Sequence, residues 1–172
     1  MINPDVNDWR SDLRMVAEMF GKEEEAEAYI SDYEAKAAEV GAAIKAVNGE
    51  QATYYAFLAG DDIHFLFTGA AYGDIFYNDM GLAMPENLPE QDSIELPMVD
   101  LEALTEIESD YILILASDEQ RAEFESSSVF NSMETVQNGN VIWVSLSPYF
   151  NQAYSPYGKY QLLDELQELL IR

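Results

Sequence analysis

The feature that most constrains the fold is an unbroken apolar run of strand length, YILILA at residues 111–116, directly after a short acidic segment. The run has no polar alternation, and a strand without alternation is covered on both faces. Such strands belong to parallel sheets that lie between helices. Just before it, Leu101, Leu104 and Ile107 recur at helical spacing. This stretch therefore predicts a short helix that leads into a buried strand.

Helical and strand patterns alternate along the rest of the chain. Trp9, Leu13, Val16 and Phe20 recur at helical spacing, and Gly21 follows them as a helix end. Further helices are expected at 22–47, 72–80, 101–107, 118–124, 129–133 and from 156 onward, strands at 52–59, 63–67, 111–116 and 141–145, and loops at 82–98 and 146–156. This order predicts a three-layer α/β/α domain with a mostly parallel, Rossmann-like central sheet.

Composition excludes several classes of function. The chain has 172 residues, which is most simply one domain, and its 48% hydrophobic content is enough for a core. Its formal net charge of −25 argues against nucleic acid or an anionic membrane as a direct partner. The absence of Cys excludes disulfides, thiolate zinc sites and a Cys nucleophile.

Catalytic signatures are also absent from the sequence. There is no G-x-S-x-G, G-x-G-x-x-G or H-E-x-x-H pattern and no phosphate-binding loop. Carboxylates are too abundant for any pair of them to indicate acid–base chemistry. We therefore expect no enzyme activity, no cofactor and no metal site.

A ligand site is expected beyond the carboxyl ends of the parallel strands. This rule selects the loops at 59–72, 92–98 and 146–156. The last of these places Tyr149, Phe150, Tyr154 and Tyr157 within nine residues. Tyr and Phe offer large apolar faces, and the Tyr hydroxyl can orient a ligand. The alternative is that these rings only pack the loop onto the sheet.

Three segments follow patterns typical of one family. Residues 9–34 contain W-x-x-D-L followed by G-K-E-x-E-A-E, residues 99–104 read V-D-x-E-x-L, and residues 136–144 read V-x-N-G-N-V-x-x-V. Asp100 and Ser109 stand where the family usually has Ser and Pro. With these patterns the chain resembles the substrate-binding proteins of ABC importers for iron–siderophores and cobalamin, and the matching segments span nearly all of it.

The resemblance implies the C-terminal lobe of a two-lobe binding protein. Residues 1–47 would be a helical lead-in that follows the interlobe helix, and residues 48–172 would form the ligand-binding lobe, with the N-terminal lobe absent. A ferric siderophore would be clamped between the lobes and delivered to the transmembrane permease subunits. The protein would be an extracytoplasmic monomer, lipid-anchored to the outer face of the cell membrane through a signal and anchor that this chain lacks.

The resemblance also assigns roles to individual residues. In relatives, aromatic residues of the 146–156 loop and residues of the 92–98 loop contact ligand, which makes Tyr149, Phe150, Tyr154, Ile94 and Leu96 candidates. An exposed Glu on each lobe docks onto Arg residues of the permease, and Glu102 occupies that position here.

The one His and the basic residues bear on the type of ligand. His64 is either structural or a ligand contact, and haem is not favoured because Gly69 and Ala70 stand where haem-binding relatives carry a His. Lys159 and Arg121 could supply positive charge for an anionic ligand, but the charge-poor aromatic face suits a neutral ferric hydroxamate better.

Three other functions remain open. Cobalamin would also suit an aromatic site. Bare Fe(III) could bind through Tyr149, Tyr154 and carboxylates, since phenolate and carboxylate oxygens are hard ligands. The chain could also be an interaction module without a small ligand.

Overall fold

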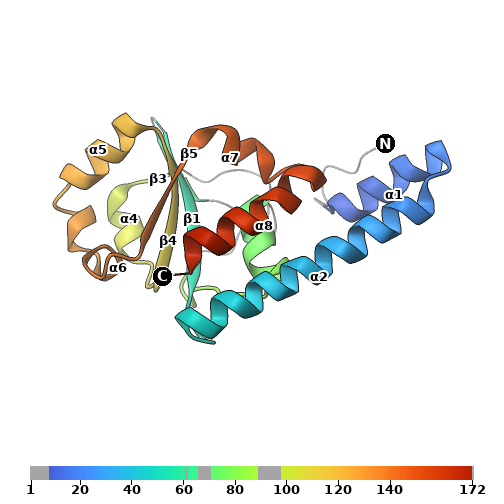
Figure 1. Ribbon diagram of the computed structural model, residues 1–172. Coiled ribbons are helices and arrows are strands. Elements are labelled where there is room, and N and C mark those ends of the chain that lie inside the picture. Colours follow the sequence, from blue (N-terminus) through green and yellow to red (C-terminus); the bar gives the residue numbers. More distant parts are fainter. Residues whose placement is uncertain (1–7, 61, 66–70, 89–97, 172) are drawn as a thin grey trace.

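The computed structural model describes residues 8–60, 62–65, 71–88 and 98–171, which form a five-stranded sheet with helices on both faces (Figure 1). The strands occur in the order β3-β2-β1-β4-β5. Their bounds are β1 Tyr54–Ala59, β2 Ile63–Phe65, β3 Met98–Val99, β4 Tyr111–Ala116 and β5 Val141–Ser145. The longer ladders, β1 with β4 and β4 with β5, are parallel, whereas β2 runs antiparallel to β1 and to β3. The predicted α/β class and layered sheet are confirmed.

Strand β4 has the bounds and the burial that its sequence predicts. Residues 112–116 are buried, because β4 pairs with β1 on one side and β5 on the other and carries a core on each face. Leu113 and Leu115 face the larger core, and Ile112 and Ile114 face the smaller one. The alternation explains why no polar residue is tolerated in this strand.

The helices divide between the two faces of the sheet. Their bounds are α1 Trp9–Phe20, α2 Glu23–Asn48, α3 Ala71–Gly73, the π-helix η1 Asp74–Asp79, α4 Leu101–Thr105, α5 Asp118–Ser126, the 3₁₀ helix η2 Phe130–Ser132, α6 Glu134–Gln137, α7 Leu146–Gln152 and α8 Pro156–Leu170. Helices α2 and α8 lie on the side of the larger core, and α4, α5 and α6 lie on the opposite side (Figure 1).

Several helix ends follow from local chemistry. Asp8 caps α1 by accepting from the Arg10 amide, and Gly21 ends it with a left-handed φ of 63°. Ser117 and Gln120 form a reciprocal capping box at the start of α5. Ser155 caps α8, whose first residue is a proline as predicted.

The prediction of a continuous loop over residues 146–156 is wrong. After β5 the chain forms α7, which is interrupted only at Ser147, where φ and ψ are −114° and 134°. Pro148 follows this extended residue and has the fixed φ that suits a first helical position. The Ser-Pro pair at 147–148 is therefore a second helix start, like the pair at 155–156.

Two other predictions differ in detail. Met98 and Val99, expected in a loop and a helical segment, form the short edge strand β3. The helix expected over 72–80 is present, but it is a short α-helix that continues as η1, with Gly81 at φ 63° after it.

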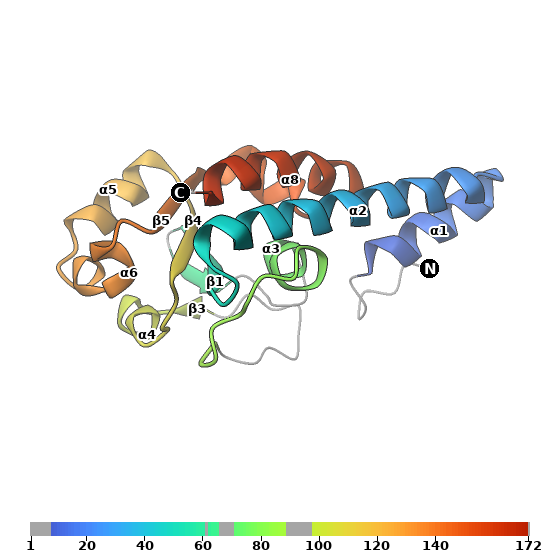
Figure 2. The same cartoon turned by 60° about the horizontal axis from the view of Figure 1, so that its bottom comes forward.

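The first two helices form an arm that projects from the rest of the molecule (Figures 1 and 2). Helix α2 packs its second half against η1 and α8, while its first half pairs with α1. The predicted apolar face of α1 is only partly covered, since Trp9 is buried but Val16 and Phe20 are exposed.

Candidate functional site

The parallel strands end together at one edge of the sheet. The register aligns Leu58 with Leu115 and Ala116 with Ser145, so β1, β4 and β5 finish at neighbouring positions. This carboxyl edge is where ligands bind in open α/β sheets. Helix α7 begins directly after β5, which places its residues at this edge.

Tyr149 lies in α7 and is half-buried against the larger core. The hydroxyl of Tyr72, which is itself buried in α3, donates to the carbonyl oxygen of Tyr149 at 3.2 Å. This bond joins α7 to the helix that crosses the same face of the sheet. Burial raises the pKa of the Tyr149 hydroxyl, and the nearby Glu165 carboxylate raises it further.

Phe150 and Tyr154 lie in the same segment. Phe150 belongs to α7, and its side chain is outside the described part of the structure. Tyr154 lies in the turn between α7 and α8 and is 43% exposed, and burial of the remainder raises the pKa of its hydroxyl. The structure thus brings Tyr149 and Tyr154 to the predicted edge, one supported by the core and one facing solvent.

His64 approaches the same edge from β2. It is half-buried and pairs with Leu58 of β1 on one side and Met98 of β3 on the other. Directly paired residues of neighbouring antiparallel strands point to the same face of a sheet. Leu58 packs against the larger core, so His64 and the exposed Met98 share the face on which Tyr149 packs.

The remaining predicted residues lie farther along the chain. Ile94 and Leu96 fall outside the described residues. Glu102 is exposed in the first turn of α4, which Asp100 caps by accepting from the Ala103 amide at 2.8 Å. A rigid short helix with an exposed carboxylate is a suitable docking element, because its direction is fixed by the cap.

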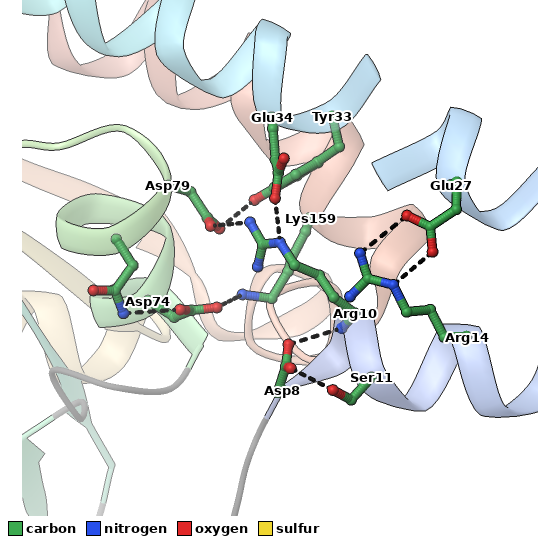
Figure 3. Close-up of polar contacts among 11 residues, drawn as sticks. Asp8, Arg10, Ser11, Arg14, Glu27, Tyr33, Glu34, Asp74, Asp79 and Lys159 are labelled. Carbon is green, nitrogen blue, oxygen red and sulfur yellow. Dashed lines mark hydrogen bonds and ion pairs between the residues drawn. The ribbon is translucent and has the colours of Figure 1, made fainter. Parts of the chain in front are cut away.

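The basic residues considered for ligand binding have other partners (Figure 3). Lys159 is 2% exposed, and its ammonium group contacts the Asp74 carboxylate at 2.7 Å. Arg121 pairs with Glu125 at 2.8 Å and lies over the Trp143 ring. Lys159 therefore supplies no free charge to a ligand, and the expectation that it could is not met.

A related polar network fixes the base of the arm (Figure 3). The Arg10 guanidinium contacts Asp79 and Glu34, both at 2.7 Å, and the Tyr33 hydroxyl donates to Asp79 at 2.6 Å. Burial and the adjacent Asp79 raise the pKa of the Tyr33 hydroxyl. The bonds connect α1, α2 and η1, and they explain why only the first turn of α1 is held firmly.

The geometry offers little for a bare metal ion. Within the described residues, no three His, Cys, Asp or Glu side chains are grouped to hold one. Iron coordination by Tyr149 or Tyr154 needs phenolate, and the raised pKa of both hydroxyls opposes its formation. The arrangement instead offers aromatic and apolar surface with a few polar atoms, which suits an organic ligand.

Sequence reasoning missed two residues of this edge. Met98 was placed in a loop, and Tyr72 had no distinguishing pattern around it. The Tyr72–Tyr149 bond joins residues 77 positions apart, so only the folded chain could reveal it. None of the described helices combines the length and apolar character needed to cross a membrane.

Comparison with known proteins gives consistent results. The sequence profile of the periplasmic binding protein family matches residues 2–145. The iron-uptake system-binding protein of Bacillus subtilis (strain 168) is 23% identical over 171 residues, which cover 95% of this chain and 53% of that protein. The iron(3+)-hydroxamate-binding protein YxeB of the same organism is 24% identical over 171 residues, which cover 93% of this chain and 52% of that protein.

Solved structures agree with the fold. FhuD2 from Staphylococcus aureus, solved with bound ferrioxamine B, aligns with a TM-score of 0.82 at 22% identity, covering 95% of this chain and 64% of that one. The five-stranded sheet and its flanking helices are thus shared with a solved binding protein. The chain spans about half the length of the curated relatives it matches.

Proposed function

This chain belongs to the periplasmic binding protein family, and we propose that it binds a ferric siderophore as the C-terminal lobe of an ABC-importer binding protein. The observation that carries the proposal is the match of two iron-uptake relatives over more than nine-tenths of the chain. The aromatic carboxyl edge supports it, because that edge offers an organic ligand a broad apolar contact surface. No catalysis and no cofactor are expected, since the iron complex is the cargo.

We assign ligand contact to Tyr149, Phe150 and Tyr154 at the start of α7 and after it. His64 is added because it shares a face of the sheet with the core against which Tyr149 packs. The same assignment extends to two residues outside the described part of the structure, Ile94 and Leu96.

The binding cleft needs a second surface. Curated relatives are about twice as long as this chain, and we propose that an N-terminal lobe closes over the carboxyl edge. Residues 1–47 would then be the helical lead-in and 48–172 the lobe itself. Because clamping adds contacts on the opposite side of the ligand, this lobe alone should bind weakly.

A ferric hydroxamate is the favoured class of ligand. One relative is named for binding iron(3+)-hydroxamate. The exposed surface near Tyr154 lacks a free buried cation, since Lys159 is paired with Asp74, and this disfavours a strongly anionic complex. Cobalamin remains the second candidate, and direct Fe(III) binding is disfavoured by the raised pKa of Tyr149 and Tyr154.

The test is a titration of the protein with a ligand panel, followed by quenching of its two tryptophans. The panel holds a ferric hydroxamate, a ferric catecholate, a ferric citrate-type siderophore, haem and cobalamin. We expect weak quenching by the hydroxamate alone, and tighter binding when an N-terminal lobe is joined to the chain. Tight binding by the single lobe would contradict the two-lobe proposal, and no response to any ferric siderophore would contradict the ligand class.

Replacing Tyr154 by alanine should weaken hydroxamate binding by about tenfold, the equivalent of one lost aromatic contact. Met84→Ala is the matched control, because Met84 is about as exposed as Tyr154 but lies next to Ala83, which pairs with Thr53 before the start of β1. Equal affinity of both variants would remove Tyr154 from the site.

Glu102 is proposed to dock onto the permease from its exposed position on α4. The family implies an extracytoplasmic location, and we propose that a lipid anchor holds the complete protein at the membrane. Glu102→Arg should leave ligand affinity unchanged and abolish capture of the detergent-solubilised permease in a pull-down. Glu106→Arg, also exposed near the end of α4, should behave as wild type. Loss of capture in both variants would indicate a general charge effect instead.

A further inference from the structure

Exposed large apolar side chains gather on one region of the molecule. Five of them lie on α1 and around the start of α8, namely Val16, Met19, Phe20, Tyr154 and Tyr157. Phe20 is 72% exposed and Tyr157 is 69% exposed. Such a concentration on one face is typical of an interaction surface, whereas singly scattered apolar residues are ordinary.

These residues surround an apolar groove of about 550 Å³ between α1, the start of α2 and the start of α8. Its walls include Leu13, Val16 and Phe20 from α1, Ala26 and Tyr29 from α2, and Pro156 from α8. The Tyr29 hydroxyl donates to the Pro156 carbonyl at 2.8 Å, which ties α2 to the start of α8. The groove is therefore a built feature of the arm.

The rim of the groove differs electrostatically from the rest of the protein. Arg14 contacts Glu27 at 2.6 Å, and Lys22 pairs with Glu25. These two basic residues are among only 8 in a chain with 33 acidic ones. The acidic side chains next to the groove are thus neutralised locally, which lowers the repulsion that a second acidic molecule would meet there.

We propose that this arm face, defined by the groove and by Met19, Phe20 and Tyr157, binds a second copy of the chain. A two-fold contact is self-complementary when one surface holds both a projecting group and a groove. Phe20 projects at the end of α1, and the groove runs beside it. Around a two-fold axis, Phe20 of each copy would enter the groove of the other, and Arg14 and Lys22 would face the partner's acidic rim.

The position of the arm makes this pairing sterically possible. Both views show α1 and the first half of α2 extending away from the sheet and from the helices that cover it (Figures 1 and 2). Two arms can meet without contact between the bodies. The inference goes beyond the proposed function and is independent of it, since it requires no ligand.

Salt provides a distinctive signature. A contact held mainly by ion pairs weakens as ionic strength rises. Here the interface is apolar with a paired rim, while the two chains carry a net charge of −25 each. Screening should therefore reduce the overall repulsion and strengthen the dimer.

The test is analytical ultracentrifugation of the whole chain over a concentration series at low and high sodium chloride. We expect a monomer–dimer equilibrium that shifts toward dimer with salt. Phe20→Glu should weaken dimerisation at least about tenfold, because a carboxylate would be buried in an apolar groove. Val47→Glu is the matched control, since Val47 is also exposed on α2 but at the opposite end from the arm face.

Far-UV circular dichroism of each variant shows that it is folded, so a loss of dimer can be assigned to the face. A monomer at every concentration and salt level would overturn the proposal and leave the arm face to a different protein. Equal weakening by Val47→Glu, or open-ended association without a dimer plateau, would overturn it as well.

Discussion

Gly41→Ala should destabilise the protein by at least about 2 kcal/mol, although alanine is the better helix former by about 1 kcal/mol. Gly41 lies inside α2, where that helix crosses the end of η1. A Cβ atom at this position would lie 2.0 Å from the Met80 carbonyl oxygen and 2.8 Å from its carbonyl carbon. The obstacle is backbone, so a side chain cannot rotate away, and α2 or η1 would have to move.

This prediction is checked by urea unfolding followed by circular dichroism. The midpoint should fall while the slope stays constant, which separates lost stability from a changed unfolded state. Ala38→Gly, at an exposed position of the same helix, measures the propensity term alone and should cost about 1 kcal/mol. A Gly41→Ala midpoint above wild type would mean that α2 and η1 are less closely packed.

The close approach at Gly41 also illustrates what the sequence could not reveal. Apolar spacing predicts that residues 22–47 form a helix, and the structure places α2 at Glu23–Asn48. Nothing in that spacing indicates that the helix meets the backbone of residue 80. Periodicity specifies which face is apolar, but the partner of that face depends on contacts between distant parts of the chain.

The same distinction applies to α1. The spacing of Trp9, Leu13, Val16 and Phe20 correctly predicts the helix. It also suggests that the four residues face a core, yet only Trp9 is buried and Phe20 is exposed. An amphipathic pattern records that a face avoids water in some state of the protein, and that state can be an assembly.

Strands were predictable in proportion to their length and burial. Six apolar residues in succession specify β4, and the five residues of β5 were also located correctly. The two residues of β3 carry no periodic signal, and they pair only because β2 presents an open edge. Local patterns thus defined the centre of the sheet, while its edge depended on tertiary pairing.

The candidate site was predicted in outline. The carboxyl-edge rule and the aromatic cluster identified the segment that holds Tyr149 and Tyr154, and the structure places both at that edge. The support beneath them was not predictable. Tyr72 and Lys159 make their important bonds to residues 77 and 85 positions away, and the sequence gave Lys159 the appearance of a free cation.

Lys159→Met should lower stability by about 3–5 kcal/mol, because it leaves the Asp74 carboxylate buried without its cation. The two side chains are only 2% and 11% exposed, and they are 2.7 Å apart. Asn78 also donates to Asp74, at 3.0 Å, but an amide cannot balance a full charge. Methionine keeps most of the lysine stem, so the loss measures the charge and not the packing.

Three controls isolate this effect in thermal and urea unfolding. Lys22→Met breaks the exposed pair with Glu25 and should cost less than about 1 kcal/mol. Lys159→Met combined with Asp74→Leu should recover most of the stability, because an apolar pair of similar volume often replaces a buried ion pair without loss. The loss in Lys159→Met should also shrink toward acid pH, where protonation removes the stranded charge.

The consequence of this substitution should reach the candidate site through the bond at Tyr72. Asp74 begins η1, and two residues earlier the Tyr72 hydroxyl holds the Tyr149 carbonyl at 3.2 Å. When the Lys159–Asp74 pair is broken, α3 loses its anchor on α8, and α7 loses its fixed position at the carboxyl edge. We therefore expect Lys159→Met to weaken ligand binding as well as stability, and the double variant to restore both. Recovery of stability without recovery of binding would mean that Lys159 acts on the ligand directly and not through α3.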